Sequence, residues 1–105
     1  MSGPRLARED AGRELELPAG GRFEVALPDL PGAGYTWEVE ELPEGARVTN
    51  ERYEPRGEGI GGETLHVFEL EAPSGGTLRL RQLQPWQGDA GVRDRYEVKL
   101  VSPGR

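Results

Sequence analysis

Residues 22–28 read RFEVALP, and the large apolar side chains Phe23, Val25 and Leu27 occupy every second position. A β-strand points successive side chains to opposite faces, so this spacing predicts a strand with one buried face. The same two-residue period, or a weaker form of it, recurs in segments 15–17, 35–39, 47–53, 65–70, 78–80 and 96–100. No long segment has the i, i+3, i+4 spacing of an amphipathic helix. The sequence therefore predicts about seven strands.

Glycine and proline lie between these segments. The chain has 16 Gly and 9 Pro among its 105 residues. They gather in segments 18–21, 28–34, 43–45, 55–62, 73–76 and 85–91. Short strands separated by regularly spaced turn residues are typical of a β-sandwich. We therefore predict an all-β fold, an immunoglobulin-like antiparallel β-sandwich of about seven strands. Residues 13–105 are expected to form this single domain and residues 1–12 a flexible N-terminal tail.

Two of the predicted strands depart from the simple pattern. Arg47–Tyr53 is more polar than the others, which is typical of an edge strand. In the segment 65–70 the apolar phase changes between Val67 and Phe68. This change predicts either a bulge or a strand that is covered on both faces.

The charge balance excludes several classes of partner. There are 13 Lys and Arg against 19 Asp and Glu, a net charge of −6, and no cysteine. An acidic chain is a poor ligand for nucleic acid or for an anionic membrane, and without cysteine there is no disulfide or thiolate site. We expect a monomer. The first 12 residues lack the apolar core of a signal peptide, so we expect a cytoplasmic protein, or a periplasmic or secreted one if a signal was trimmed. Lys99 is the only lysine, an Arg bias that indicates a bacterial source.

His66 is the only histidine and thus the only ordinary base near neutral pH. An enzyme would need a nucleophile built around this residue, in a cleft with perturbed carboxylates beside it. We favour the simpler interpretation, a half-buried strand histidine with one hydrogen bond. The acidic residues have no calcium-loop spacing, and one histidine cannot make a zinc site. We therefore expect no enzyme, no metal and no cofactor.

Three long connections are expected at one end of the sandwich. Because successive strands run in opposite directions, alternate connections lie at the same end, and these are 28–34, 55–61 and 85–92. Loops clustered on a rigid scaffold are typical of a binding module. Within them, Gly59-Ile60-Gly61-Gly62 lacks the lysine and helix of a phosphate-binding loop, which favours a hairpin connection.

The two tryptophans differ in their surroundings. Trp37 alternates with polar residues in a predicted strand, which is typical of the core tryptophan of an immunoglobulin-like sandwich. Trp86 lies in a loop among Gln84, Gln87 and Gly88. It is either a cap over the end of the core or an exposed binding anchor, and the sequence leaves both open.

At these three connections lie the motifs LPGAGYTW at 30–37, GIGG at 59–62 and QPW at 84–86. In their order they resemble the N-P-T-T-G-Y/F-x-W, G-x-G-G and R-P-W segments of the chagasin family, inhibitors of papain-like cysteine proteases. The resemblance extends from Leu15 to Val101. The chain departs from the family pattern where Leu30-Pro31-Gly32-Ala33 replaces Asn-Pro-Thr-Thr and where Gln84 replaces arginine.

The resemblance implies a reversible, competitive inhibitor of papain-like (cathepsin L-type) cysteine proteases, with a single chagasin-like domain. Three loops would occlude the active-site cleft, the first entering it and the other two straddling it. Carried over by motif, the protease-binding residues are Pro31, Gly32, Ala33, Gly34, Gly59, Ile60, Gly61, Gly62, Pro85 and Trp86. The alternative is an immunoglobulin-like protein-interaction or adhesion module without protease inhibition.

Overall fold

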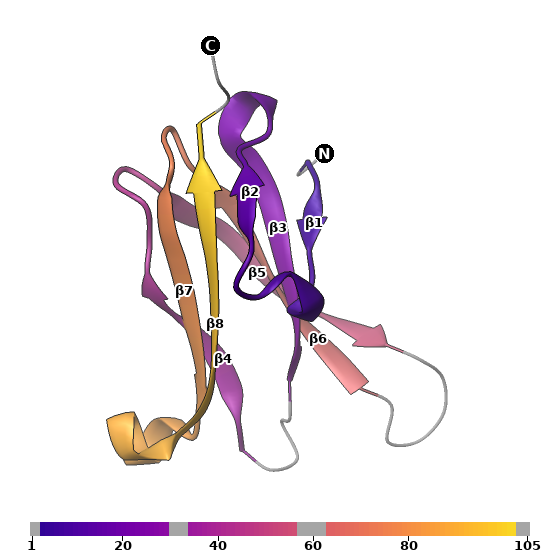
Figure 1. The fold of residues 1–105 in the computed structure, drawn as a ribbon. Coiled ribbons are helices and arrows are strands. Elements are labelled where there is room, and N and C mark those ends of the chain that lie inside the picture. Colours follow the sequence, from indigo (N-terminus) through magenta and orange to yellow (C-terminus); the bar gives the residue numbers. More distant parts are fainter. Residues whose placement is uncertain (1–2, 30–33, 57–62, 103–105) are drawn as a thin grey trace.

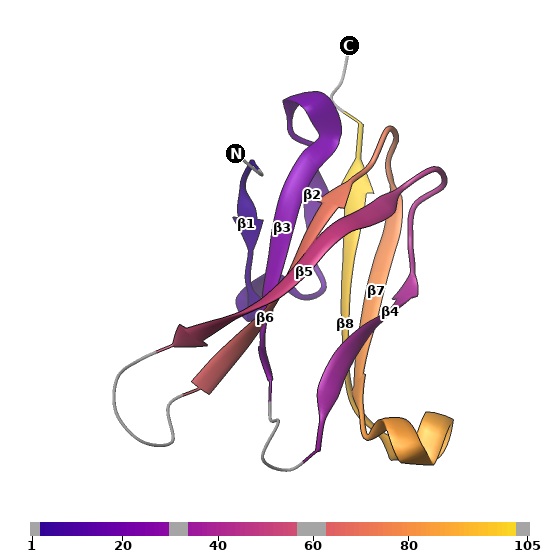
Figure 2. The same ribbon diagram turned by 180° about the vertical axis from the view of Figure 1, so that it is seen from behind.

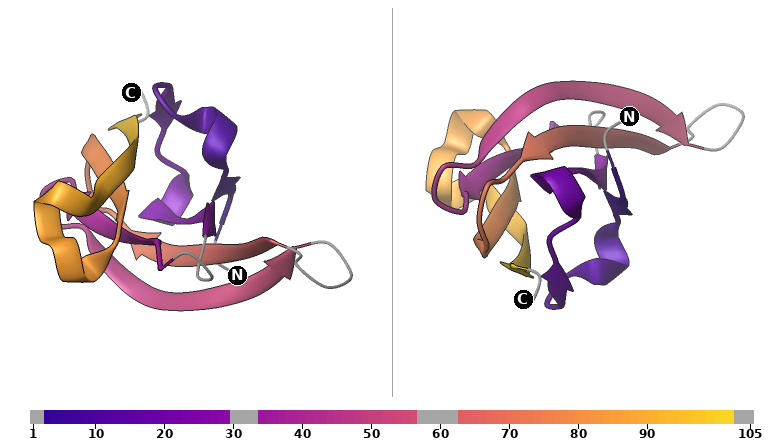
Figure 3. Two further views of the ribbon diagram at one scale, coloured as in Figure 1. Left: turned by 90° about the horizontal axis from the view of Figure 1, so that it is seen from below. Right: turned by 90° about the horizontal axis from the view of Figure 1, so that it is seen from above.

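The computed structural model describes residues 3–29, 34–56 and 63–102, which form two four-stranded sheets packed as a sandwich (Figure 1). The first sheet has the order β1 (Arg5–Leu6), β3 (Arg22–Asp29), β6 (Glu63–Glu71), β5 (Arg47–Arg56). The second has the order β2 (Glu14–Glu16), β8 (Val92–Val101), β7 (Gly76–Leu83), β4 (Thr36–Glu41). The 3-10 helices are η1 (Arg8–Asp10), η2 (Ala19–Gly21) and η4 (Pro85–Gly91). The two layers are seen end-on in Figure 3.

The structure confirms the predicted all-β sandwich and all seven predicted strands, and it adds β1. Most neighbouring strands are antiparallel, but β1 pairs with β3 and β2 pairs with β8 in parallel. Alternation places the apolar residues of both sheets between the layers. Trp37 is only 3% exposed, as expected of a core residue. The core cluster comprises Leu17, Phe23, Val25, Leu27, Trp37, Phe68, Leu70, Ala72, Leu78, Leu80, Tyr96, Val98 and Leu100.

The phase change in β6 reflects a strand covered on both faces. His66, Val67 and Phe68 are all buried, and β6 pairs with β3 without a shift in register. The irregularity lies instead in β5, between Val48 and Asn50, and β5 occupies the sheet edge as predicted.

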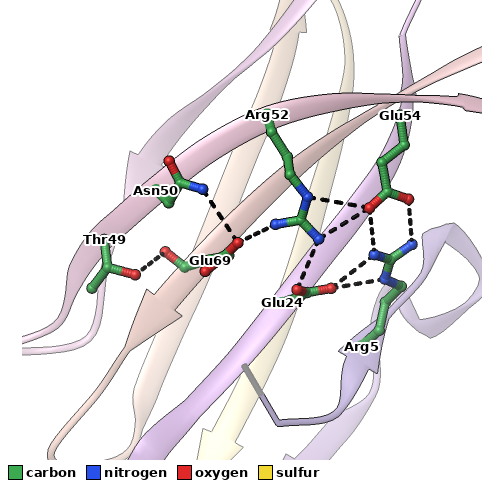
Figure 4. A network of polar contacts seen from close by, with 7 residues as sticks. All are labelled: Arg5, Glu24, Thr49, Asn50, Arg52, Glu54 and Glu69. Atoms are coloured by element: carbon green, nitrogen blue, oxygen red, sulfur yellow. Dashed lines mark hydrogen bonds and ion pairs between the residues drawn. The ribbon is translucent and has the colours of Figure 1, made fainter. Parts of the chain in front are cut away.

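An ion-pair network covers the outer face of the first sheet (Figure 4). Glu24 accepts hydrogen bonds from Arg5 at 2.9 Å and from Arg52 at 3.0 Å, and Glu54 accepts from the same two arginines. The hydrogen bonds from Arg5, assisted by Arg52, lower the pKa of Glu54 to about 2. Burial raises the pKa of Glu24, but its hydrogen bonds to Arg52 and Arg5 outweigh burial and leave its pKa below the usual value. Val67, opposite Arg52 in the register, is thereby covered on the outer side.

Residues 3–12, which lie within the predicted tail, contact both sheets. The Glu24 N–H donates to the Pro4 carbonyl at 2.9 Å, next to the β1–β3 pairing. Further along, the Tyr96 hydroxyl donates to the Ala7 carbonyl at 3.1 Å, and Arg8 pairs with Asp94 at 2.8 Å. These contacts are with residues distant in sequence, which a local hydrophobic pattern does not register.

Three pairs of strand ends meet at one end of the sandwich, as predicted. We call this end the loop pole; there β3, β5 and β7 end and β4, β6 and β8 begin (Figures 1 and 2). In both views the ends of β5 and β6 extend to one side of the pole, while η4 lies on the other side. The loop pole is therefore built from both sheets.

Candidate functional site

The structure describes three of the ten predicted binding residues. Gly34, Pro85 and Trp86 lie at the loop pole. Outside the described residues are Pro31, Gly32, Ala33, Gly59, Ile60, Gly61 and Gly62. The described part of the site consists of the strand ends and of parts of the first and third connections.

Trp86 is an exposed aromatic residue that lies against Gly34. Its side chain is 69% exposed and is no part of the core cluster, which excludes the core-cap interpretation. A Cβ atom added at Gly34 would lie 2.3 Å from Cη2 of the indole, and Gly34 has a φ of +80°. Any other residue at position 34 would collide with the indole and strain the backbone. The first and third connections are thus in direct contact.

The third connection is closed by its own backbone. The Gln87 N–H donates to the Gln84 carbonyl at 2.9 Å, and the Gln84 N–H donates to the Gly91 carbonyl at 3.4 Å. A Cβ atom at Gly91 would lie 3.0 Å from the Gln84 carbonyl oxygen, so the two ends of the third connection are tightly packed against each other. These bonds brace η4, a short 3-10 segment that carries Trp86 and is kinked at Gly88.

The start of the first connection is fixed to the second sheet. The Trp37 indole N–H donates to the Pro28 carbonyl at 2.7 Å, and the Gln82 amide reaches the same oxygen at 3.4 Å. On the far side of the connection, the Arg93 guanidinium lies over the Tyr35 ring, 5.1 Å from its centroid. Cation–π contacts of this kind stabilise exposed sites modestly. The core tryptophan therefore also anchors the loop pole.

A buried polar cluster beneath the loop pole was not predicted. Asp29, Thr36 and His66 come together from β3, β4 and β6, and His66 Nε2 also lies 2.9 Å from Glu51 Oε1. His66 is 2% exposed, so it is fully buried and not half-buried as expected. A sealed imidazole has no access to substrate, which contradicts the interpretation of His66 as a catalytic base.

Within the described part of the chain, no three His, Asp or Glu side chains gather as a metal site would require. None of the helices described there has the length and apolar character needed to cross a bilayer. The geometry of the loop pole, an exposed aromatic held on a braced scaffold, is suited to binding a protein surface.

The sequence family agrees with this geometry. A model of the chagasin family peptidase inhibitors, I42, matches residues 16–100. The chain therefore belongs to the chagasin family of peptidase inhibitors. Membership of an inhibitor family also confirms the expectation that the protein is not an enzyme. No curated protein sequence matches the chain.

Two solved structures share the fold. One is the crystal structure of the cysteine protease inhibitor EhICP2 from Entamoeba histolytica, with a TM-score of 0.73 and 17% identity over 94% of each chain. The other is the solution structure of amebosin, with a TM-score of 0.66 and 21% identity, over 95% of this chain and 97% of that chain. At these identities the likeness establishes the fold alone.

Proposed function

We propose that this protein is a reversible, competitive inhibitor of papain-like cysteine proteases of the cathepsin L type, and that it binds through the loop pole. Family membership supports the inhibitory role, and a structure of the same fold is described as a cysteine protease inhibitor. The segments 31–34 and 59–62, with Pro85 and Trp86, form the proposed contact surface. The inhibitor supplies no chemistry; it occupies the cleft.

The observation that carries this proposal is the exposed indole of Trp86 held against Gly34. Large exposed aromatic side chains dominate the energetics of many protein interfaces once they are desolvated by the partner. The Gln84–Gly91 and Gln87–Gln84 hydrogen bonds already order the helix that carries the indole. Less conformational entropy is then lost on binding, which favours affinity.

The alternative is an interaction or adhesion module of the same fold that has no affinity for proteases. Its loop pole would bind another protein, and Trp86 would serve that partner. The two functions differ in one measurable respect, since only the inhibitor raises the apparent KM of a cysteine protease.

Steady-state inhibition separates these functions. We expect competitive inhibition of papain and of a cathepsin L-type protease, and no inhibition of trypsin or of a caspase, whose clefts have different shapes. Heat-unfolded protein provides the control for nonspecific effects. Inhibition of trypsin equal to that of papain, or no effect on papain at high micromolar inhibitor, contradicts the proposal.

A further inference from the structure

Asp29 and Thr36, which lie before and after segment 30–33, are joined by a part-buried hydrogen bond. Asp29 is the last described residue before this segment and the last of β3, and Thr36 is the first residue of β4. The Thr36 hydroxyl donates to Asp29 Oδ2 at 3.3 Å, and Asp29 is almost fully buried. Since β3 and β4 belong to different sheets, this bond ties the two layers together at the point where the first connection leaves one and enters the other.

His66 completes the contact from a third strand. Its Nδ1 atom lies 3.4 Å from Thr36 Oγ1 and 3.7 Å from Asp29 Oδ2. On the other side of the ring, Nε2 lies 2.9 Å from Glu51 Oε1. Both ring nitrogens therefore lie near a polar partner, and the imidazole links β5 to Asp29 and Thr36.

Aromatic stacking holds the imidazole in this orientation. Its ring lies 4.2 Å from the Phe68 ring at an interplanar angle of 21°, and 4.5 Å from the Tyr53 ring at 31°. A ring held between two others has little freedom to turn. Removing one partner leaves another buried polar group without its hydrogen bond, which lowers the stability of the protein. The contacts therefore depend on one another.

We propose that Asp29, Thr36 and His66, the loop-base cluster, are positioning residues for inhibition. They hold the two ends of the first connection at a fixed separation. Less conformational entropy is then lost when the protease binds. None of the three needs to touch the protease. This inference rests on the proposed function, because it concerns the loop that would enter the cleft.

The test uses a matched pair of substitutions at Thr36. Thr36→Val keeps the shape of the side chain and removes the hydroxyl, whereas Thr36→Ser keeps the hydroxyl. We expect Thr36→Val to weaken papain inhibition about fivefold, the effect of losing one hydrogen bond. In the free Thr36→Val protein, the amide hydrogen exchange rates of Gly34 and Tyr35 should also rise about fivefold. Thr36→Ser should restore both quantities to near the wild-type values.

Thr49→Val is the control for a merely structural effect. The Thr49 hydroxyl donates to the Glu69 carbonyl at 3.2 Å (Figure 4). Thr49 is near the start of β5 in the first sheet, whereas β5 reaches the loop pole at its other end. This variant also loses one hydroxyl hydrogen bond, but an exposed one, so its melting temperature should fall by no more than that of Thr36→Val. Papain inhibition and exchange at Gly34 and Tyr35 should stay as in the wild type.

Three results overturn the inference: Thr36→Val inhibits and exchanges like the wild type, Thr36→Ser is as impaired as Thr36→Val, or Thr49→Val weakens inhibition equally. A wild-type protein that fails to inhibit papain contradicts the proposed function instead. In that case the exchange comparison between Thr36→Val and Thr36→Ser still decides whether the loop-base cluster fixes the first connection.

Discussion

Replacing Gly34 by alanine should perturb both the backbone and the indole of Trp86. The φ of +80° at Gly34 is left-handed, which costs an alanine about 1–2 kcal/mol. The new Cβ would lie 2.3 Å from Cη2, whereas ordinary contacts begin at 3.4 Å. The indole must therefore retreat by about 1 Å, a typical response to overpacking. Because Trp86 is exposed, it can tilt outward with little further loss of stability.

A double-mutant cycle separates these two effects. Denaturant unfolding of Gly34→Ala should show a loss of about 1–2 kcal/mol in both the wild-type and the Trp86→Ala backgrounds, since the backbone strain is the same in each. Papain inhibition should weaken about tenfold in the wild-type background, part of the loss expected for an interface aromatic, and clearly less in the Trp86→Ala background. An equal loss of inhibition in both backgrounds refutes the contact between the two connections, and an unchanged stability of Gly34→Ala refutes the left-handed backbone at Gly34.

Two further predictions concern the scaffold. Trp37→Ala should destabilise the domain by about 3–5 kcal/mol, because it empties a core site and leaves the Pro28 carbonyl without its 2.7 Å donor; a cooperative melt near that of the wild type would count against this. Arg5→Gln should lower stability at pH 7 by about 1 kcal/mol or less, as for a partly exposed pair. The pKa of Glu54 is lowered to about 2, so this contribution is present above about pH 4.5 and disappears as the pH falls toward 2. The free energies of unfolding of the wild type and of Arg5→Gln, measured with urea across this pH range, should converge in acid. A difference between them that widens in acid would contradict the prediction.

The fold could be predicted from the sequence because the two-residue period is local. Phe23, Val25 and Leu27 identify their strand without reference to any other part of the chain. The position of Trp37 in the core followed from the same alternation. By contrast, β1 has one apolar residue, Leu6, and its place depends on ion pairs between Arg5 and residues 19 and 49 positions away. The two-residue period of apolar side chains does not predict ion pairs between residues so far apart in the sequence.

The site was predictable only in part for the same reason. The motifs placed Gly34 and Trp86 in two connections of one pole, but not in contact with each other. The loop-base cluster joins residues 7 and 30 positions apart, each unremarkable as a polar strand residue. One signal was present: His66 falls on the inward phase of its strand, two residues before Phe68, where an isolated polar side chain requires buried partners.

The inhibition constant of Trp86→Ala toward papain, measured beside its thermal melt, tests the loop pole as the protease-binding surface. Trp86 is 69% exposed, so its removal should leave the melting temperature close to that of the wild type. Inhibition should weaken roughly 30-fold, equivalent to about 2 kcal/mol for an interface aromatic, and Trp86→Phe should recover part of it. If Trp86→Ala inhibits papain as strongly as the wild type, the exposed indole is not part of the binding surface, and the account of the loop pole is contradicted.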